Sequence, residues 1–592
     1  MRSRPAVRAS VCGVVAVVAL GALTATAAAQ GDVLVTNGSP PRPFSQNKQN
    51  EPTVAIDQAP GRNNVVVAGA NEEIDMEPCN SGADNTCPFT PGVGVSGVYF
   101  SFDNGNSWMQ PTYTGRTARD CPDTPGPDAG CTSHPGLIGT LPWYAENGLV
   151  SDGDPAVAFG PRPGPNGFSW SNGSRLYYAN LTSNLGATRS ESVFKGFEAI
   201  AVSRTDDPET AALGGPSGKA AWMQPVIISQ QSGTTFSDKE QIWADNAESS
   251  PFFGTVYACW AAFRGQEKSG NAAPAPLFVG VSHDGGDTWR THQITAAANN
   301  SQRNPADGCT MRTDSRGRAY VFGVGTVSST GHQAFELMSQ SDDGGSNWSR
   351  PRPVAGPVTQ PGVIDPVQGR AVIDGVAGAR SDLSPAPSVD IANGAPTGAG
   401  ATNRIVMSYV SGSLATPHVF FTESTSRGAS WSTPHPIETA GDRGYYAAPA
   451  ISPNGSDVYV VYNAFTTPFQ PTTATPRSLV GVVKHADTPG ATGPTGTFTE
   501  IHRGVPGDPR GSSANALISE FLGDYVYAAA TNDYGAAVWN DARFADDCPA
   551  IDAWRQALQN GDSPPAPAPE QQCPPNFGNS DIFGGSFPDP TP

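Results

Sequence analysis

Charged side chains are scarce in this 592-residue sequence, and basic ones are the scarcest. Asp, Glu, Lys and Arg together make up 15% of the chain, and 35 Lys and Arg face 54 Asp and Glu, which gives a net charge of −19. Such an acidic chain repels phosphate groups, so bulk electrostatics exclude a nucleic-acid binder. The low overall charge also excludes a coiled coil and a highly charged disordered chain.

Long hydrophobic runs are absent beyond the start of the chain. One apolar run, Val11–Leu23, follows three arginines and precedes the small residues Ala27–Ala29, as in a secretory signal peptide with its cleavage site. A membrane anchor is the alternative, but the run is shorter than the ~20 residues that a spanning helix needs. We therefore expect a signal peptide at residues 1–29, no membrane span, and a protein secreted to the cell exterior.

Metal-binding spacings of cysteine and histidine are missing as well. Neither CxxC nor HxxxH occurs in the sequence, so a zinc cluster is the weaker interpretation of the cysteines. Cys12 falls within the expected signal peptide, and an even number of cysteines in an exported chain indicates disulfides. Proximity along the chain favours the pairs Cys79–Cys87, Cys121–Cys131, Cys259–Cys309 and Cys548–Cys573.

Glycine and proline are abundant, with 67 and 56 residues respectively. Both interrupt helices, so the composition favours many short strands joined by turns. With 38% hydrophobic residues, a chain of this length can still bury a large core.

One short pattern, S-x-D-x-G-x-x-W, recurs along the chain. It is complete in Ser101–Trp108, Ser282–Trp289 and Ser341–Trp348, and Ser424–Trp431 follows it except that Ser426 replaces the aspartate. Ser and Asp side chains can bond to nearby backbone groups, and Gly supplies a positive φ at no steric cost. Each copy therefore predicts a β-hairpin turn whose Trp packs against a neighbouring sheet.

Strand-like runs around these turns form seven units of similar layout. The first strand of each unit is expected at Thr53–Ile56, Ala156–Phe159, Gln241–Ala244, Cys309–Thr313, Ser388–Ile391, Ala448–Ile451 and Tyr525–Ala530. This repetition predicts an all-β fold, a β-propeller of seven four-stranded blades, with six blades as the alternative count. A sandwich or β-helix is the alternative fold.

The last unit needs strands from elsewhere in the chain. Ala550–Arg555 is the expected third strand, and Asp32–Thr36 near the mature N-terminus is expected to close the ring as the fourth. We assign the propeller to residues 30–560. Residues 561–592 are expected to be a Pro/Ala-rich linker and a C-terminal tail that the Cys548–Cys573 disulfide would pin back.

The repeated segments resemble Asp-boxes, also called BNR repeats, of the sialidase-like superfamily. The resemblance covers most of residues 50 to 555, and Ser237–Glu240 and Glu520–Tyr525 also resemble segments of exported bacterial Asp-box proteins. It implies a propeller with structural motifs on its outer turns. A sialidase also has three arginines, a Tyr–Glu nucleophile pair, an acid/base Asp and a Phe/Tyr-Arg-Ile-Pro motif. That motif is absent, and Asn50–Pro52 stands in its place.

Acidic residues recur where each innermost strand begins, and ligands usually bind at that end of a propeller channel. From these positions we name catalytic candidates, with Tyr446 as a possible nucleophile and Arg443 as a contact for an anionic sugar; they are Tyr446, Asp524, Glu520 and Arg443. The expected ligand-binding residues are Glu51, Asp154, Asp238, Glu240, Tyr445 and Tyr525.

Three interpretations of this acidic set remain open. Crowded carboxyl groups could divide into an acid and a base of a glycosidase, several could bind Ca²⁺, or they could cap strand ends and pair with nearby Arg or Lys. The leading hypothesis is a monomeric, exported sialidase-like propeller that acts on a glycan or cell-envelope ligand as a glycoside hydrolase. The alternative is a non-enzymatic propeller that binds carbohydrate or protein at the cell exterior.

Overall fold

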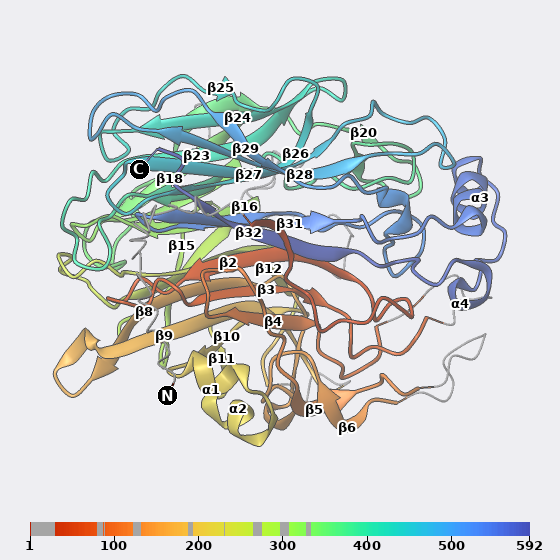
Figure 1. Cartoon of the computed structure of the whole chain (residues 1–592), viewed down its shortest axis with the longest axis horizontal. Coiled ribbons are helices and arrows are strands. Elements are labelled where there is room, and N and C mark those ends of the chain that lie inside the picture. The colour runs from red at the N-terminus through yellow and green to blue at the C-terminus, as the bar shows by residue number, and fades with distance from the viewer. Residues whose placement is uncertain are drawn as a thin grey trace.

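The chain folds as a seven-bladed β-propeller (Figure 1). The computed structural model describes Met1 and residues 30–79, 87, 89–121, 132–186, 193–229, 231–264, 275–296, 307–326 and 333–591. The predicted seven blades and the all-β class are confirmed. Nearly all of the expected signal peptide, and Cys131, lie outside the described residues.

Each blade is an antiparallel sheet that runs from the central channel outward. The strands of blades 1 to 3 are β2 (Gln49–Ile56), β3 (Val66–Glu72) and β4 (Ser96–Ser101); β7 (Leu149–Ser151), β8 (Ala156–Gly164), β9 (Gly167–Asn184), β10 (Ala199–Thr205) and β11 (Val226–Ile227); and β12 (Thr235–Ala244), β13 (Val256–Arg264), β14 (Leu277–Ser282) and β15 (Arg290–Gln293). In blade 1 an isolated bridge between Phe100 and Met109 takes the place of an outer strand.

Blades 4 to 6 repeat the four-stranded layout. Their strands are β16 (Asp307–Thr313), β17 (Ala319–Gly325), β18 (Ala334–Ser341) and β19 (Arg352–Val358); β22 (Ser388–Ile391), β23 (Ile405–Gly412), β24 (Pro417–Ser424) and β25 (His435–Pro436); and β26 (Arg443–Ile451), β27 (Asp457–Phe465), β28 (Leu479–Asp487) and β29 (Thr499–Arg503).

Two hairpins and several short helices decorate the blades. They are β5 (Tyr113–Thr117) with β6 (His134–Ile138), β20 (Val363–Ile364) with β21 (Ala371–Val372), the helices α1 (Pro208–Ala212), α2 (Gly215–Ala221), α3 (Pro549–Gln559) and α4 (Pro569–Gln572), and the 3-10 turns η1 (Ala145–Asn147) and η4 (Pro509–Gly511). Among the described residues, no helix combines the length and apolarity that crossing a membrane requires.

Blade 7 joins both ends of the chain. Its order is β1 (Gln30–Leu34), β32 (Asp581–Pro588), β31 (Tyr534–Asp541) and β30 (Tyr527–Ala530), so the predicted closure by an N-terminal strand is confirmed. In Figure 1 the blue strands β31 and β32 lie beside the red strands β2 and β3, where the ring closes. The closure removes the free sheet edges that would otherwise invite association.

The third strand of blade 7 corrects the sequence-based prediction. Ala550–Arg555 lies in α3, where Pro549 occupies the first turn and the apolar residues Ile551 and Trp554 share a helical spacing. The third strand of blade 7 is β32 instead. Its two glycines interrupt the alternation of apolar and polar residues by which a strand is recognised in a sequence. Residues 581–588 therefore belong to the propeller, and its predicted end at residue 560 is wrong.

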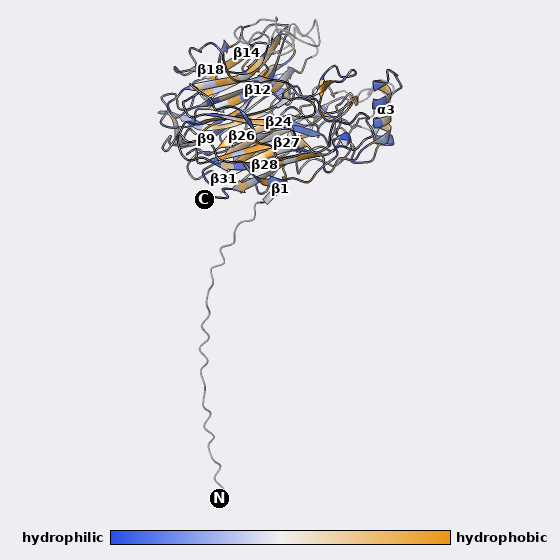
Figure 2. Ribbon diagram, turned by 90° about the horizontal axis from the view of Figure 1, so that it is seen from above, coloured by the Kyte–Doolittle hydropathy of each residue, from blue (hydrophilic) through white to orange (hydrophobic). Residues whose placement is uncertain are grey.

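The core lies between the blades rather than inside one of them. All nine residues of β27 are buried, because both faces of a middle strand are covered by neighbouring blades. Between blades 1 and 7, Val54 and Ile56 pack with Tyr534 and Val538. Figure 2 shows hydrophobic strands such as β26 and β28 within the body and α3 at its side. Each fully buried Val or Ile contributes about 1.5–3 kcal/mol.

The four repeated turns share one hydrogen-bond pattern. In Ser282–Trp289 the Ser282 hydroxyl donates to Asp284 at 2.8 Å, and Asp284 accepts the backbone N–H of Thr288 at 2.9 Å. The backbone N–H of Gly286 donates to Ser282 at 2.9 Å. In the fourth copy Ser426 replaces the aspartate and accepts the Ser430 N–H at 2.8 Å. The turn thus tolerates serine because a hydroxyl oxygen serves as the acceptor.

Disulfides join Cys79 to Cys87, Cys259 to Cys309 and Cys548 to Cys573, as proximity along the chain predicts. Cys121 is also disulfide-bonded. The Cys259–Cys309 bond links β13 of blade 3 to β16 of blade 4, so it ties adjacent blades together. Bonds of this kind typically stabilise a fold by about 2–4 kcal/mol.

Candidate functional site at the mouth of the propeller

The innermost strands are irregular where they begin. β2, β12, β16 and β26 each carry a shift of register near their first residues. Glu51, Asp154 and Lys239 have φ values of 57°, 51° and 59°, a region that costs a non-glycine residue about 1–2 kcal/mol. Such bulges redirect side chains. We call this end of the central channel the mouth.

Asp524 contacts more than one charged or polar side chain, namely Arg380, Tyr446 and Lys239. Its carboxylate is fully buried and accepts hydrogen bonds from Arg380 Nε at 2.9 Å and from the Tyr446 hydroxyl at 3.1 Å. Lys239 Nζ lies 2.9 Å from the same carboxylate. Burial alone would raise the pKa of Asp524, but the charges of Arg380 and Lys239 hold it well below its usual range. Asp524 is therefore ionised.

Lys239 gathers further carboxyl groups around its ammonium. Its Nζ lies 2.7 Å from Asp154, 3.7 Å from Asp238 and 3.9 Å from Glu51. Burial opposes its charge, but these neighbours raise the pKa of Lys239 well above its usual value. In return, Lys239 lowers the pKa of Asp154 against the effect of burial. Asp154 is thus a second ionised carboxylate.

The carboxyl groups of Glu51 and Glu240 have raised pKa values, in contrast to the lowered values of Asp524 and Asp154. Burial, and then the charge of Asp154, raise the pKa of both carboxyl groups well above the usual value. Glu51 accepts a hydrogen bond from the Asn71 side chain at 2.8 Å. Glu240 is 6% exposed, and neither of its carboxyl oxygens has a hydrogen-bond partner. The raised pKa values favour the protonated form of both groups.

A cavity opens beside this cluster. Glu240, Tyr446, Asp524 and Tyr525 line it, together with Lys239. The unpartnered carboxyl of Glu240 and the ionised carboxylate of Asp524 thus lie against one cavity. An acid and an anion in a shared cavity are the elements of acid-assisted bond cleavage.

Sequence reasoning missed two members of the mouth. Arg380 also approaches Glu51 at 3.4 Å, and its guanidinium lies 4.6 Å from the centre of the Phe521 ring. Its sequence signal is a basic residue in the segment just before β22. Glu198 lies beside Asp152, and burial raises the pKa of Asp152 to about 6 and that of Glu198 well above its usual value.

The structure places three of the predicted residues outside contact with Asp524. Arg443 donates to the backbone carbonyls of Thr467, Ile373 and Leu414 at 3.0, 2.8 and 2.7 Å. Glu520 is paired with Arg477, which also contacts Asp374 at 3.1 Å. Tyr445 donates to the carbonyl of Arg380 at 2.8 Å. These contacts hold loops in place, although one carboxyl oxygen of Glu520 is buried without a hydrogen-bond partner.

The mouth does not fit the Ca²⁺ that the sequence suggested. The position among Asp154, Asp524 and Glu51 already holds a cation, the ammonium of Lys239. The positive charge that balances these carboxylates comes from the chain itself.

A three-arginine clamp is also absent from the part of the mouth that the structure describes. Arg380 is the arginine that contacts Asp524 and Glu51, and both of those partners are carboxyl groups. Its guanidinium is therefore already occupied. An anionic sugar would meet the carboxylates of Asp154 and Asp524 beside Arg380, whose guanidinium already contacts two carboxyl groups.

A second cavity lies toward the other ends of the innermost strands. Its charged groups are paired: Arg312 Nε lies 3.1 Å from Asp390, and the guanidinium lies over the ring of Trp243 at 4.6 Å. Apolar residues such as Ile56 and Phe159 line much of the rest. We therefore place the candidate site at the mouth.

No protein-family model and no curated protein match this chain. Among solved structures, the Hadza microbial sialidase Hz136 is similar at 11% identity and TM-score 0.39, over 70% of this chain and 63% of that one. The chain thus spans less than two thirds of that sialidase. The intramolecular trans-sialidase from Ruminococcus gnavus matches at 10% identity and TM-score 0.39, over 73% and 94%. The α-L-arabinanase from Penicillium chrysogenum matches at 11% and 0.36, over 73% and 92%. Likeness at these values assigns no activity.

Proposed function

We propose that this chain is an exported Asp-box propeller of the sialidase-like type that hydrolyses glycosidic bonds at its mouth. The observation that carries the proposal is the pairing of Glu240 and Asp524 on one cavity. Glu240 has an unsatisfied, buried carboxyl, and Asp524 is an ionised carboxylate. Two carboxyl groups in different ionisation states are the usual equipment of a glycosidase.

In the proposed reaction Glu240 is the general acid. It gives its proton to the glycosidic oxygen as the bond to the anomeric carbon breaks. The positive charge that develops on the sugar is stabilised by Asp524 and Asp154, whose own charges are fixed by Lys239 and Arg380. Water then adds to the anomeric carbon and returns a proton to Glu240, so the acid is regenerated.

Tyr446 has a supporting role in this proposal. Its hydroxyl donates to Asp524, and burial raises its pKa well above the usual value of a tyrosine. Asp524 is too weak a base to remove that proton while Arg380 and Lys239 hold it ionised. Tyr446 therefore orients Asp524 rather than serving as the nucleophile. The excess of carboxylates favours a neutral sugar over an anionic one.

The test is a screen of the purified protein against neutral and sialyl aryl-glycosides, with Glu240→Gln as the diagnostic variant. We expect turnover of a neutral glycoside and a loss of about 10²–10⁴-fold in kcat for Glu240→Gln. The melting temperature of this variant should stay the same or rise at neutral pH, because the amide removes the free-energy cost of protonating Glu240 on folding. The matched control is Glu248→Gln, on an exposed residue, which should leave turnover unchanged.

A second candidate function is binding without catalysis. It is favoured because Lys239 and Arg380 are already paired with the carboxylates of the mouth, Asp524 among them. These ion pairs make the mouth a rigid polar surface. Glycan-array binding with no turnover of any glycoside would support this candidate and exclude the hydrolase. Turnover that survives in Glu240→Gln would show that another residue is the acid.

A further inference from the structure

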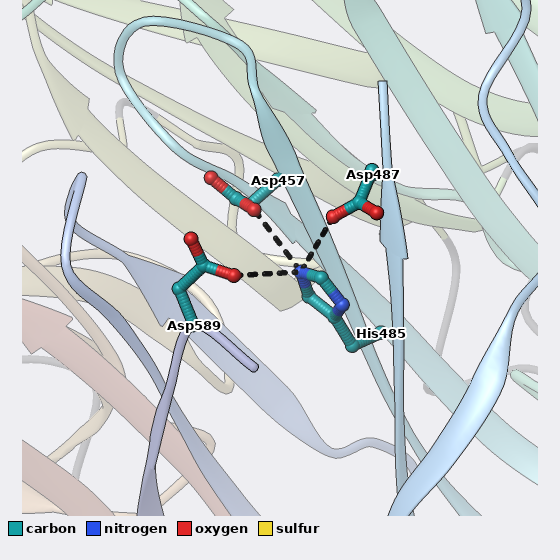
Figure 3. A group of neighbouring side chains, drawn as sticks. All are labelled: Asp457, His485, Asp487 and Asp589. Atoms are coloured by element: carbon teal, nitrogen blue, oxygen red, sulfur yellow. Dashed lines mark hydrogen bonds and ion pairs between the residues drawn. The ribbon is translucent and has the colours of Figure 1, made fainter. Parts of the chain in front are cut away.

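A group of donor side chains lies away from the mouth, between blades 6 and 7 (Figure 3). His485 Nε2 lies 3.1 Å from Asp457 and 3.9 Å from both Asp487 and Asp589. The four donor atoms all lie within 4.8 Å of one another. In Figure 3 the three carboxylates surround a single ring nitrogen of the histidine.

The strand register explains why these residues meet. In the β27–β28 ladder Asp457 faces Asp487 and Tyr459 faces His485, so all four point to the same side of the sheet. Asp589 follows directly after β32 and comes from the neighbouring blade. The Thr591 hydroxyl donates to Asp487 at 2.5 Å and to Asp589 at 3.2 Å, so it holds together the two less buried carboxylates of the group.

Tyr459 supplies an independent observation. It is 1% exposed, and its hydroxyl has no hydrogen-bond partner. The centre of its ring lies 5.0 Å from that of His485. After burial, the charges of Asp457, Asp589 and Asp487 also raise the pKa of its hydroxyl. Tyr459 shares the face of the β27–β28 ladder that carries Asp457, His485 and Asp487, and a buried hydroxyl without a partner on that face indicates room for a further ligand.

We propose that Asp457, His485, Asp487 and Asp589 form a binding site for a divalent transition-metal ion, with zinc as the best-fitting ion. One imidazole nitrogen and three carboxylate oxygens are a donor set that zinc accepts, whereas Ca²⁺ and Mg²⁺ prefer oxygen alone. Zinc bonds of about 2.0–2.1 Å place tetrahedral donors about 3.3 Å apart. The 3.9 Å distances of Asp487 and Asp589 from His485 Nε2 would have to shorten by roughly 0.6 Å to reach this spacing.

The ion would have a structural role at the closure of the ring. Three ligands belong to the β27–β28 ladder of blade 6, and the fourth lies just beyond β32, which pairs with β1 in blade 7. Binding would therefore fasten the end of the chain to blade 6. All four protein positions are filled by side chains, which is the arrangement of a structural site rather than a catalytic one.

The site is tested on the untagged full chain after treatment with a chelator. We expect isothermal titration with zinc to show one ion per chain, and Co²⁺ to give the visible absorption of a nitrogen- and oxygen-bound ion. The melting temperature should rise with zinc, since an ion that binds only the folded state stabilises it. Absence of zinc binding at millimolar concentration would overturn the proposal.

Variants locate the ion. Asp487→Asn and Asp589→Asn should each weaken zinc binding at least as much as the roughly 10–100-fold that follows the loss of an outer contact. Asp533→Asn is the matched control, because Asp533 lies near Tyr459 but contributes no donor to the group, and its affinity should match that of the parent. Equal affinities in all three variants would show that zinc binds elsewhere and would overturn the assignment.

Discussion

The aspartates of the repeated turns and the carboxyl groups of the mouth are held in opposite ways. Asp343 accepts hydrogen bonds from Asn347, four residues away, and remains exposed. Asp524 is buried, and its partners Arg380 and Tyr446 lie 144 and 78 residues away. A turn therefore closes on its own residues, whereas the mouth exists only once the whole ring has formed.

The difference has energetic consequences. Each turn aspartate exchanges hydrogen bonds with water for hydrogen bonds with nearby donors, and it loses little hydration because it stays exposed. Its contribution to the free energy of unfolding is therefore small and independent of the other turns. The mouth groups have lost most of their water, so each charge depends on its partners. Removing one mouth charge should therefore be costly, and the same change in a turn should be mild.

The largest effect is expected for Asp524→Asn. The substitution leaves Lys239 and Arg380 with fewer opposing charges in a buried setting, which should lower the free energy of unfolding by about 3–5 kcal/mol. Urea denaturation with intact disulfides measures it. Asp343→Asn is the matched change in a turn, and a loss of similar size there would refute the contrast between local and long-range carboxylates.

A dependence on pH should follow from the protonated groups of the mouth. The pKa of Asp152 is raised from 3.8 to about 6, so its contribution to stability is complete below pH 4 and is lost as the pH rises through 6. We expect unfolding free energy to fall by about 1–3 kcal/mol between pH 5 and pH 7.5. The turn aspartates have lowered pKa values, so their contribution is lost only at acidic pH.

Denaturation at a series of pH values, for the parent and Asp152→Asn, tests this dependence. The variant should show a shallower fall over the same range, because an amide does not titrate. A parent whose stability is constant from pH 5 to pH 7.5 would contradict the assignment of protonated carboxyl groups to the mouth.

A smaller loss is expected for Asp343→Ser, which copies Ser426 into the third turn. The hydroxyl keeps an acceptor for the Asn347 N–H but loses the bond from the Asn347 side chain, which measures 2.7 Å. The free energy of unfolding should fall by about 1 kcal/mol. Asp342→Ser, which removes an exposed ion pair with Arg318, serves as the control and should change it by less than about 1 kcal/mol.

The smallest effect is a gain from Ser426→Asp. An aspartate there would accept both the N–H and the hydroxyl of Ser430, as Asp284 does with Thr288. Stability should rise by about 0.5 kcal/mol, visible as a higher denaturation midpoint. A decrease would mean that the fourth turn differs from the other three in more than its side chain.

The propeller could be predicted from sequence because its signals are local. The turn pattern, the strand runs and the N-terminal strand each depend on neighbouring residues, and the seven blades follow from their repetition. The missed strand, β32, reads D-I-F-G-G-S-F-P, in which two glycines break the alternation. α3 was mistaken for a strand because a short apolar run has no unique period.

The mouth could be predicted only in part. Glu51, Asp154 and Glu240 are chosen by counting from the strand starts, and in the structure they lie near Lys239 or its neighbours. Arg443 and Glu520 occupy similar positions in the sequence but turn toward other partners. A strand start gives the position of a backbone, whereas the direction of its side chain depends on bulges and on loops from other blades.

The sequence by itself determined the repeat, the turns and the blade number, since each arises from contacts a few residues apart or from periodicity. Only the tertiary structure decided which carboxyl groups are ionised, because their pKa values depend on burial and on charges brought from distant blades. It also decided that Arg380 joins Asp524, and that Asp589 meets His485. Both pairings require the ring to close, and closure is a property of the whole chain.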